Sequence, residues 1–224
     1  MTFAATHEQR GDEKDRAHAA TIMHIASLSD DADVPSTIDL RLPADAHVWA
    51  REAEGKRPHR EQLRALFAAN LGGATRVLEL GSGPGFLAEH LLRMCPITSY
   101  TLFDFSRPML ELSRERIGAH PAATFVLGDF KQPGWTAPLT LPYDAIVAMQ
   151  SIHEIRHKRH LPALYREVHT LLRAGGSFLV CDHLPMNDKL YATEAEQHAA
   201  LRGAGFTPTT IAIVEQMYLI AAAA

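Results

Sequence analysis

The sequence has few cysteines, no long apolar run and no excess of positive charge. Its two cysteines, Cys95 and Cys181, argue against a disulfide framework and fit a reducing, cytoplasmic compartment. No segment approaches the roughly 18–20 apolar residues of a membrane helix, and the N-terminus lacks the apolar core of a signal peptide. The net charge of −4 gives no basic footprint for nucleic acid. We therefore expect a cytoplasmic protein that binds neither membranes nor nucleic acid.

Histidine is common, with 13 residues, but its spacing does not indicate a metal site. His153, His157 and His160 fall at i, i+4 and i+7, which is the spacing of one helical face. However, the charged stretch around them and Pro162 indicate a helix end or a loop, and no cysteine or acid completes a ligand set at a typical spacing. We therefore expect no metal.

The most informative stretch is residues 76–92, RVLELGSGPGFLAEHLL. A short apolar run precedes three glycines at alternate positions, Gly81, Gly83 and Gly85, and the apolar period then becomes helical. Glycine allows a sharp turn and a close backbone approach to a ligand, and Pro84 fits the start of a helix. Strand, glycine turn and helix together predict the start of a βαβ nucleotide-binding unit.

Strands and helices alternate along the rest of the chain, which predicts a parallel sheet covered by helices on both faces. Further strands are expected at 99–105, 123–127, 143–150, 177–181, 208–214 and 216–222. Helices are expected at 58–71, 160–173 and 193–204, and another begins after Ser106. Ser106 is the expected N-cap of that helix, and a glycine pair is expected to end the helix at 160–173.

Three regions follow from this pattern. Residues 1–34 are polar and alanine-rich and predict a disordered or helical extension, with a short helix at 17–28. Residues 35–75 form an N-terminal cover segment that includes the helix at 58–71, and residues 76–224 form the main domain.

Several motifs in series resemble class I S-adenosylmethionine (SAM)-dependent methyltransferases. The segment LELGSGPG is similar to the first motif of that family, and Asp104 follows Gly85 by nineteen residues at the end of the second strand. Similar segments continue through Gly128-Asp129-Phe130, YDAIVAMQSIHEI, LLRAGGSFLVCDH and EQHAALRGAGF. The resemblance implies an α/β, Rossmann-like, seven-stranded and mostly parallel sheet whose last strand is antiparallel, with an N-terminal helical cover.

The same resemblance implies SAM as cofactor and assigns its contacts. Asp104 would hold the ribose hydroxyls, and Asp129 would accept a hydrogen bond from the adenine amino group. The other implied cofactor-binding residues are Glu79, Gly81, Ser82, Gly83, Phe105, Met109, Phe130 and Gln150. Residues of the N-terminal cover that would line the pocket are His47, Trp49, Lys56 and Arg57.

A general base is needed only when the acceptor must lose a proton, and histidine has a suitable pKa. His153 is the leading candidate because it follows the fourth strand at the ligand end of the sheet, and His183 and His47 are the alternatives. The acceptor is expected to be a small molecule, since no large substrate domain is evident. Oxygen, nitrogen, carbon and sulfur all stay open as the methylated atom.

Two other functions share these motifs. An NAD(P)-dependent oxidoreductase would have the same βαβ start, but Phe86 stands where the third glycine of G-x-G-x-x-G belongs. A non-catalytic SAM-binding protein would keep every cofactor motif. The absence of a DPPY-type run after the fourth strand argues against adenine-N6 methylation, and the absence of a Pro-Cys dipeptide there argues against cytosine-C5 methylation.

Overall fold

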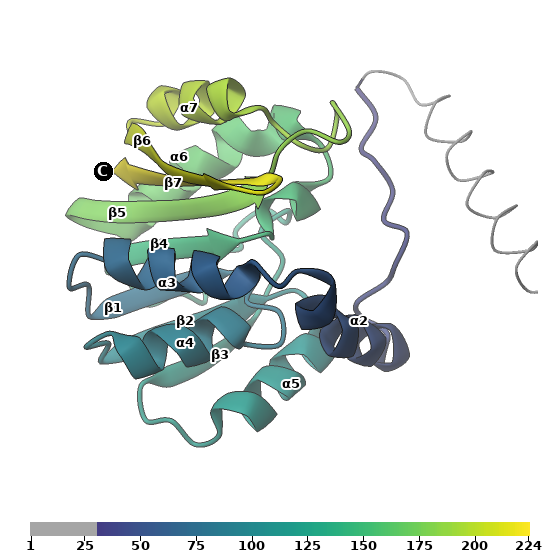
Figure 1. Ribbon diagram of the computed structural model, residues 1–224. Coiled ribbons are helices and arrows are strands. Elements are labelled where there is room, and N and C mark those ends of the chain that lie inside the picture. The colour runs from purple at the N-terminus through teal and green to yellow at the C-terminus, as the bar shows by residue number, and fades with distance from the viewer. Residues whose placement is uncertain (1–30) are drawn as a thin grey trace, which may run out of the picture. The chain divides into compact units, whose positions relative to one another are not determined.

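The computed structural model describes residues 31–224, and Ser36–Ala224 form one compact α/β unit (Figure 1). The helix predicted at 17–28 lies outside the described residues, as does most of the predicted extension 1–34. The strands are β1 Arg76–Leu80, β2 Ser99–Asp104, β3 Ala123–Leu127, β4 Tyr143–Met149, β5 Leu172–His183, β6 Thr207–Val214 and β7 Met217–Ala223. The helices are α2 Pro43–Lys56, α3 Arg60–Asn70, α4 Phe86–Met94, α5 Arg107–Ile117, α6 Leu161–Leu171 and α7 Glu194–Gly203, with short 3₁₀ helices η1 Ile152–Ile155 and η2 Lys158–His160.

The seven strands form one sheet in the order β3-β2-β1-β4-β5-β7-β6. Strands β1 to β5 are parallel, whereas β7 runs antiparallel to both β5 and β6. This arrangement confirms the predicted fold class. The strand order reverses between β1 and β4, and in open α/β sheets ligands bind in the crevice at this switch point, beyond the carboxyl ends of the strands.

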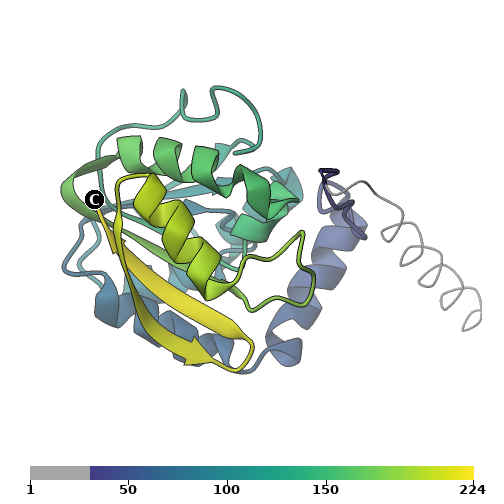
Figure 2. The same cartoon turned by 90° about the horizontal axis from the view of Figure 1, so that it is seen from above.

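Helices cover both faces of the sheet (Figure 2). One hydrophobic cluster joins the sheet to α3, α4 and α5 through Leu63, Phe67, Leu87, Leu91 and Leu110. The other joins it to α6 and α7 through Leu164, Tyr165, Val168, Leu201 and Phe206. Helix α2 lies beyond the carboxyl end of the parallel strands (Figure 1).

Side chains cap α5 and α7, and the first of these caps confirms the prediction. Ser106 is the N-cap of α5, and its hydroxyl accepts a hydrogen bond from Met109 N at 3.2 Å. Thr193 caps α7 in a reciprocal capping box with Glu196. Each cap satisfies backbone donors that the first helical turn leaves unpaired, which fixes where the helix begins.

Helix α2 is absent from the prediction because its sequence has no large apolar stripe. Its buried apolar side chains are only those of Ala46 and Ala53, so the helical period is not visible in a hydrophobic pattern. Helix α3 begins at Arg60 rather than at Pro58, since a turn closed by Arg60 N and Arg57 O at 3.1 Å comes first.

Two further helix ends differ from the prediction. Helix α4 begins at Phe86 and not at Pro84, because Gly85 is its N-cap in a left-handed conformation with φ of 82°. Helix α6 ends at Leu171, before the glycine pair. Leu172 is already extended and pairs with Tyr143, and the residues after it bulge before regular pairing resumes at Ser177. The glycine pair therefore lies within β5.

Candidate functional site

The glycine turn after β1 has a conformation that only glycine adopts easily. Gly81, Gly83 and Gly85 have φ values of 67°, 53° and 82°. A Cβ on Gly81 would lie 2.4 Å from Ser151 Cβ, so the turn and the chain after β4 are in direct contact. By contrast, a Cβ on Gly83 would meet no atom within 4 Å, which leaves open space beside the turn.

Asp104 ends β2 and lies next to this turn. Its Oδ2 accepts a hydrogen bond from Gly83 N at 2.7 Å, and its Oδ1 accepts one from Ser106 N at 2.8 Å. Burial raises the pKa of Asp104 to about 6, although both hydrogen bonds act in the opposite direction. A carboxylate oxygen has more than one lone pair. The two backbone contacts therefore fix the orientation of the carboxylate and leave it capacity to accept hydrogen bonds from a ligand.

A cavity lies at this end of the sheet, where open α/β sheets bind their ligands. Eleven of the predicted site residues line it: Trp49, Arg57, Gly81, Gly83, Asp104, Phe105, Met109, Phe130, Gln150, His153 and His183. The remaining lining residues are Leu40, Arg60, Ser151 and Glu154. The sequence analysis had not singled out Leu40, Arg60 or Glu154 as ligand contacts.

Glu79 and Ser82 line an adjoining cavity of about 430 Å³ empty volume instead. Burial raises the pKa of Glu79 to about 8, and Tyr100 OH donates a hydrogen bond to its Oε2 at 2.7 Å. Among the described residues, the buried Ser82 Oγ has no hydrogen-bond partner. An unsatisfied buried hydroxyl is costly unless a ligand or water completes it, so this cavity is suited to a polar group.

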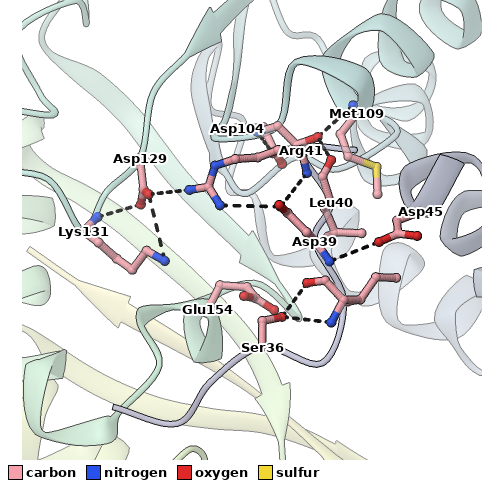
Figure 3. A network of polar contacts seen from close by, with 12 residues as sticks. Ser36, Asp39, Leu40, Arg41, Asp45, Asp104, Met109, Asp129, Lys131 and Glu154 are labelled. Atoms are coloured by element: carbon pink, nitrogen blue, oxygen red, sulfur yellow. Dashed lines mark hydrogen bonds and ion pairs between the residues drawn. The ribbon is translucent and has the colours of Figure 1, made fainter. Parts of the chain in front are cut away.

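Asp129 lines neither of these cavities, and its carboxylate contacts a residue that precedes α2. Arg41 Nη2 lies 3.3 Å from Asp129 Oδ2 (Figure 3). The Arg41 guanidinium also lies over the Phe105 ring, 4.7 Å from its centroid. The preceding residue, Leu40, accepts a hydrogen bond from the Ser106 hydroxyl through its carbonyl oxygen. The chain before α2 is thus attached to the β2–α5 loop, a contact with no local signal in the sequence.

His153 lies in η1, directly after β4, and is paired with Asp182 at the end of β5. His153 Nδ1 is 2.8 Å from Asp182 Oδ1, and His153 N donates to Asp182 Oδ2 at 2.9 Å. Burial lowers the pKa of His153, but the charge and hydrogen bond of Asp182 outweigh it, so the net shift is upward. Asp182, itself buried, is held below its ordinary pKa by His153 and His183 despite burial. The pair fixes the ring and leaves Nε2, which lies 3.7 Å from Glu154 Oε1, as the nitrogen that faces other groups.

His183 lines the same cavity, with its ring centroid 5.6 Å from that of His153. Burial lowers the pKa of His183 to about 4, and the charges of Arg57 and Arg60 act in the same direction, against Asp182. His183 is therefore neutral at pH 7 and a weak base. His47 does not line the cavity described above, and its Nδ1 is 2.6 Å from Pro43 O.

Gln150 connects the strand end to the N-terminal cover. Its φ of 56° is rare for a residue other than glycine, and such strain persists where surrounding contacts hold it. Arg60 Nε donates to Gln150 Oε1 at 2.6 Å, and Gln150 Nε2 contacts Met217 Sδ. Arg60 is thus a buried arginine that links α3 to the end of β4.

The described residues contain no group of three or more His, Cys, Asp or Glu side chains that could hold a metal ion. Within the same part of the chain, no helix is long and apolar enough to cross a membrane. Cys95 and Cys181 are both free thiols.

Residues 77–176 match the family model described as a methyltransferase domain. Two malonyl-[acyl-carrier protein] O-methyltransferases are similar in sequence. The one from Halalkalibacterium halodurans is 32% identical over 72 residues, which is 32% of this chain and 27% of that protein. The one from Magnetococcus marinus is 30% identical over 102 residues, 45% of this chain and 35% of that protein. The chain thus matches about a third of the length of these relatives.

Solved structures share the fold at low sequence identity. Human N-acetylserotonin methyltransferase in complex with SAM aligns with a TM-score of 0.66 and 18% identity, covering 82% of this chain and 56% of that one. An O-methyltransferase-like protein from Nostoc punctiforme aligns with a TM-score of 0.70 and 16% identity, covering 92% and 67%. The family match, the strand order and the glycine turn agree: residues 77–176 are similar to a methyltransferase domain, and the fold is that of SAM-dependent methyltransferases.

Proposed function

We propose that this chain transfers the methyl group of SAM to a hydroxyl oxygen of a small molecule, with His153 as general base. The observation that carries the proposal is the His153–Asp182 pair, because its histidine lines the same cavity as Asp104 and Gln150. The curated relatives are named O-methyltransferases, which favours oxygen as the methylated atom. Because they align over only about a third of their length, their own substrates are not carried over.

The polar groups of the two cavities fit SAM. Asp104 would hold the ribose hydroxyls, and the unpartnered Ser82 Oγ together with Glu79 offers contacts for the polar methionine end. The open space beside Gly83 leaves room for a ligand against the turn. An apolar surface for the adenine comes from Phe105, Met109 and Phe130. Asp129 would accept a hydrogen bond from the adenine amino group while it stays in its ion pair with Arg41.

When bound, SAM supplies an electrophilic methyl group on a positively charged sulfur. The protein supplies orientation and a proton acceptor. Gln150, fixed by Arg60, and Ser151, fixed through its hydroxyl to Leu80 O at 2.6 Å, define the strand end where the acceptor approaches. His153 Nε2 takes the proton of the acceptor hydroxyl, and Asp182 stabilises the resulting imidazolium. We further propose that residues 35–75 act as the cover of this site and that residues 76–224 form the SAM-binding domain.

Calorimetric titration with SAM, S-adenosylhomocysteine and NADH in parallel tests the cofactor. We expect micromolar binding of the first two and none of NADH. Asp104→Ala should weaken SAM binding by about 1.5–3 kcal/mol, the usual scale for hydrogen bonds to a charged group. Binding of NADH alone would support an oxidoreductase, and unchanged SAM affinity in Asp104→Ala would remove the ribose role.

Turnover to S-adenosylhomocysteine in an acceptor screen separates an enzyme from a non-catalytic SAM-binding protein. In the screen, His153→Gln should keep SAM affinity and lose turnover on the order of 10²-fold or more, as expected for a general base. Full activity in His153→Gln would exclude it as the base.

A further inference from the structure

The N-terminal cover places more positive than negative charge against the two cavities. Arg57 and Arg60 line the main cavity, and Arg60 and Arg64 line the adjoining one. Glu54 forms ion pairs with two of them, at 2.9 Å to Arg64 Nη1 and 3.7 Å to Arg60 Nη1. Arg57 forms no ion pair with any residue that the structure describes. One carboxylate therefore faces three guanidinium groups.

Of the acids on the opposite side of the cavities, Asp104 already accepts two backbone hydrogen bonds and is assigned above to the ribose of SAM, and the others are neutral or paired. Burial raises the pKa of Glu79 to about 8, so its carboxyl is largely protonated at neutral pH. Asp182 is paired with His153 at 2.8 Å, and Glu154 is paired with Arg156 at 3.3 Å. A partly buried cation without a counter-ion is unfavourable, so such an excess is typical of a site that receives an anion.

Arg60 lines both cavities, whereas Arg64 lines the adjoining one and Arg57 the main one. Arg60 and Arg64 share the cavity of Ser82, where the methionine end of the cofactor is proposed to lie, and SAM brings its own carboxylate there. Arg57 lines only the main cavity, together with His153 and His183. Because these three residues line one cavity, the Arg57 side chain borders the proposed acceptor end. In the main cavity Arg60 already donates to Gln150 Oε1 at 2.6 Å, so the charge of Arg57 is left for the acceptor.

We propose that the acceptor is a small hydroxy acid whose carboxylate is bound by Arg57 while its hydroxyl faces His153. This inference rests on the proposed function, since it uses the acceptor end defined by His153. Guanidinium groups bind carboxylates through two parallel N–H···O contacts, which would also orient the hydroxyl. Arg57 would then determine specificity by rejecting neutral analogues.

The test uses the full chain saturated with S-adenosylhomocysteine. It is titrated with salicylate, 3-hydroxybenzoate and 3-hydroxybutyrate, each beside its amide, which keeps the shape and removes the charge. In the wild type we expect at least one acid to bind about tenfold or more tightly than its amide. Arg57→Gln should remove this preference and Arg57→Lys should keep part of it. Arg51→Gln is the matched control, because it removes an exposed arginine of α2 outside the cavities.

Three results would overturn the inference: equal binding of every acid and its amide, an unchanged preference in Arg57→Gln, or no binding of any acid. The titration with S-adenosylhomocysteine alone keeps the two proposals apart. If that ligand fails to bind, the proposed function is wrong, whereas an Arg57-dependent preference for acids would still establish the anion site. If it binds and the acids behave like the amides, only the anion site is lost.

Discussion

At the scale of single residues, the site depends on buried carboxyl groups that have different neighbours. Asp182 is paired with a histidine and is held below its ordinary pKa, whereas Asp104 accepts only backbone hydrogen bonds and its pKa rises to about 6. Glu79 accepts a single hydrogen bond from Tyr100 and its pKa rises to about 8. Burial raises the pKa of all three carboxyl groups, and the hydrogen-bond or charge partner decides the net direction of the shift.

The Asp182–His153 pair predicts the pH dependence of turnover. The raised pKa of His153 means that activity should fall as the pH drops through a value above about 6.5, where the ring becomes protonated. Asp182→Asn removes the charge that raises this pKa, so the acidic limb of kcat/KM should move to lower pH while the maximum falls about tenfold or more. If Asp182 had only a structural role, the limb would stay at its wild-type pH.

At the scale of elements, the turn between β1 and α4 is tied to the chain that follows β4. Gly81 has a positive φ and its Cα faces Ser151, whose hydroxyl donates to Leu80 O at 2.6 Å. The close approach brings the turn next to the strand end that carries Gln150. The site therefore needs glycine at this position for two reasons, conformation and space.

Gly81→Ala should lower the free energy of unfolding by about 2–4 kcal/mol, because a left-handed conformation and a close contact both become unfavourable. Gly72→Ala is the matched control, since Gly72 has a φ of 64° but no atom within 4 Å of an added Cβ. It should cost only about 1–2 kcal/mol. Urea denaturation of the protein without cofactor measures both, and equal losses would mean that the contact with Ser151 relaxes freely.

At the scale of the whole molecule, stability should depend on the proton of Glu79. The folded protein keeps this proton up to a pH of about 8, whereas an ordinary glutamate loses it near 4.5. Between these values the folded state binds more protons than the unfolded state, so the contribution of Glu79 to stability falls as pH rises, by up to about 1.4 kcal/mol per pH unit.

Glu79→Gln keeps an acceptor for Tyr100 OH and removes the titration. As the pH rises from 5 to 8, the free energy of unfolding of the wild type should therefore fall relative to that of Glu79→Gln. Urea denaturation across this range measures the difference, and Glu111→Gln, which removes an exposed carboxylate from α5, is the control. A difference that does not change with pH would show that Glu79 is already ionised.

Local patterns in the sequence determined most of the fold. The glycine turn, the Ser106 cap and the alternation of strands with helices are features of neighbouring residues, so they predicted the βαβ start and the sheet, and they fixed the place of Asp104 at a strand end. The prediction failed at α2, where only alanines are buried, and at the ends of α3, α4 and α6, where turns or glycines shift the boundary by a few residues.

The contacts between distant segments were decided only by the tertiary structure. His153 meets Asp182 because β4 and β5 are neighbours in the sheet, so their carboxyl ends come together. Arg60 reaches Gln150, and Arg41 reaches Asp129, because the chain before β1 crosses the ends of the strands. Strand order and the path of the N-terminal cover are set by packing over the whole chain, and no local pattern of residues encodes which side chains then face each other.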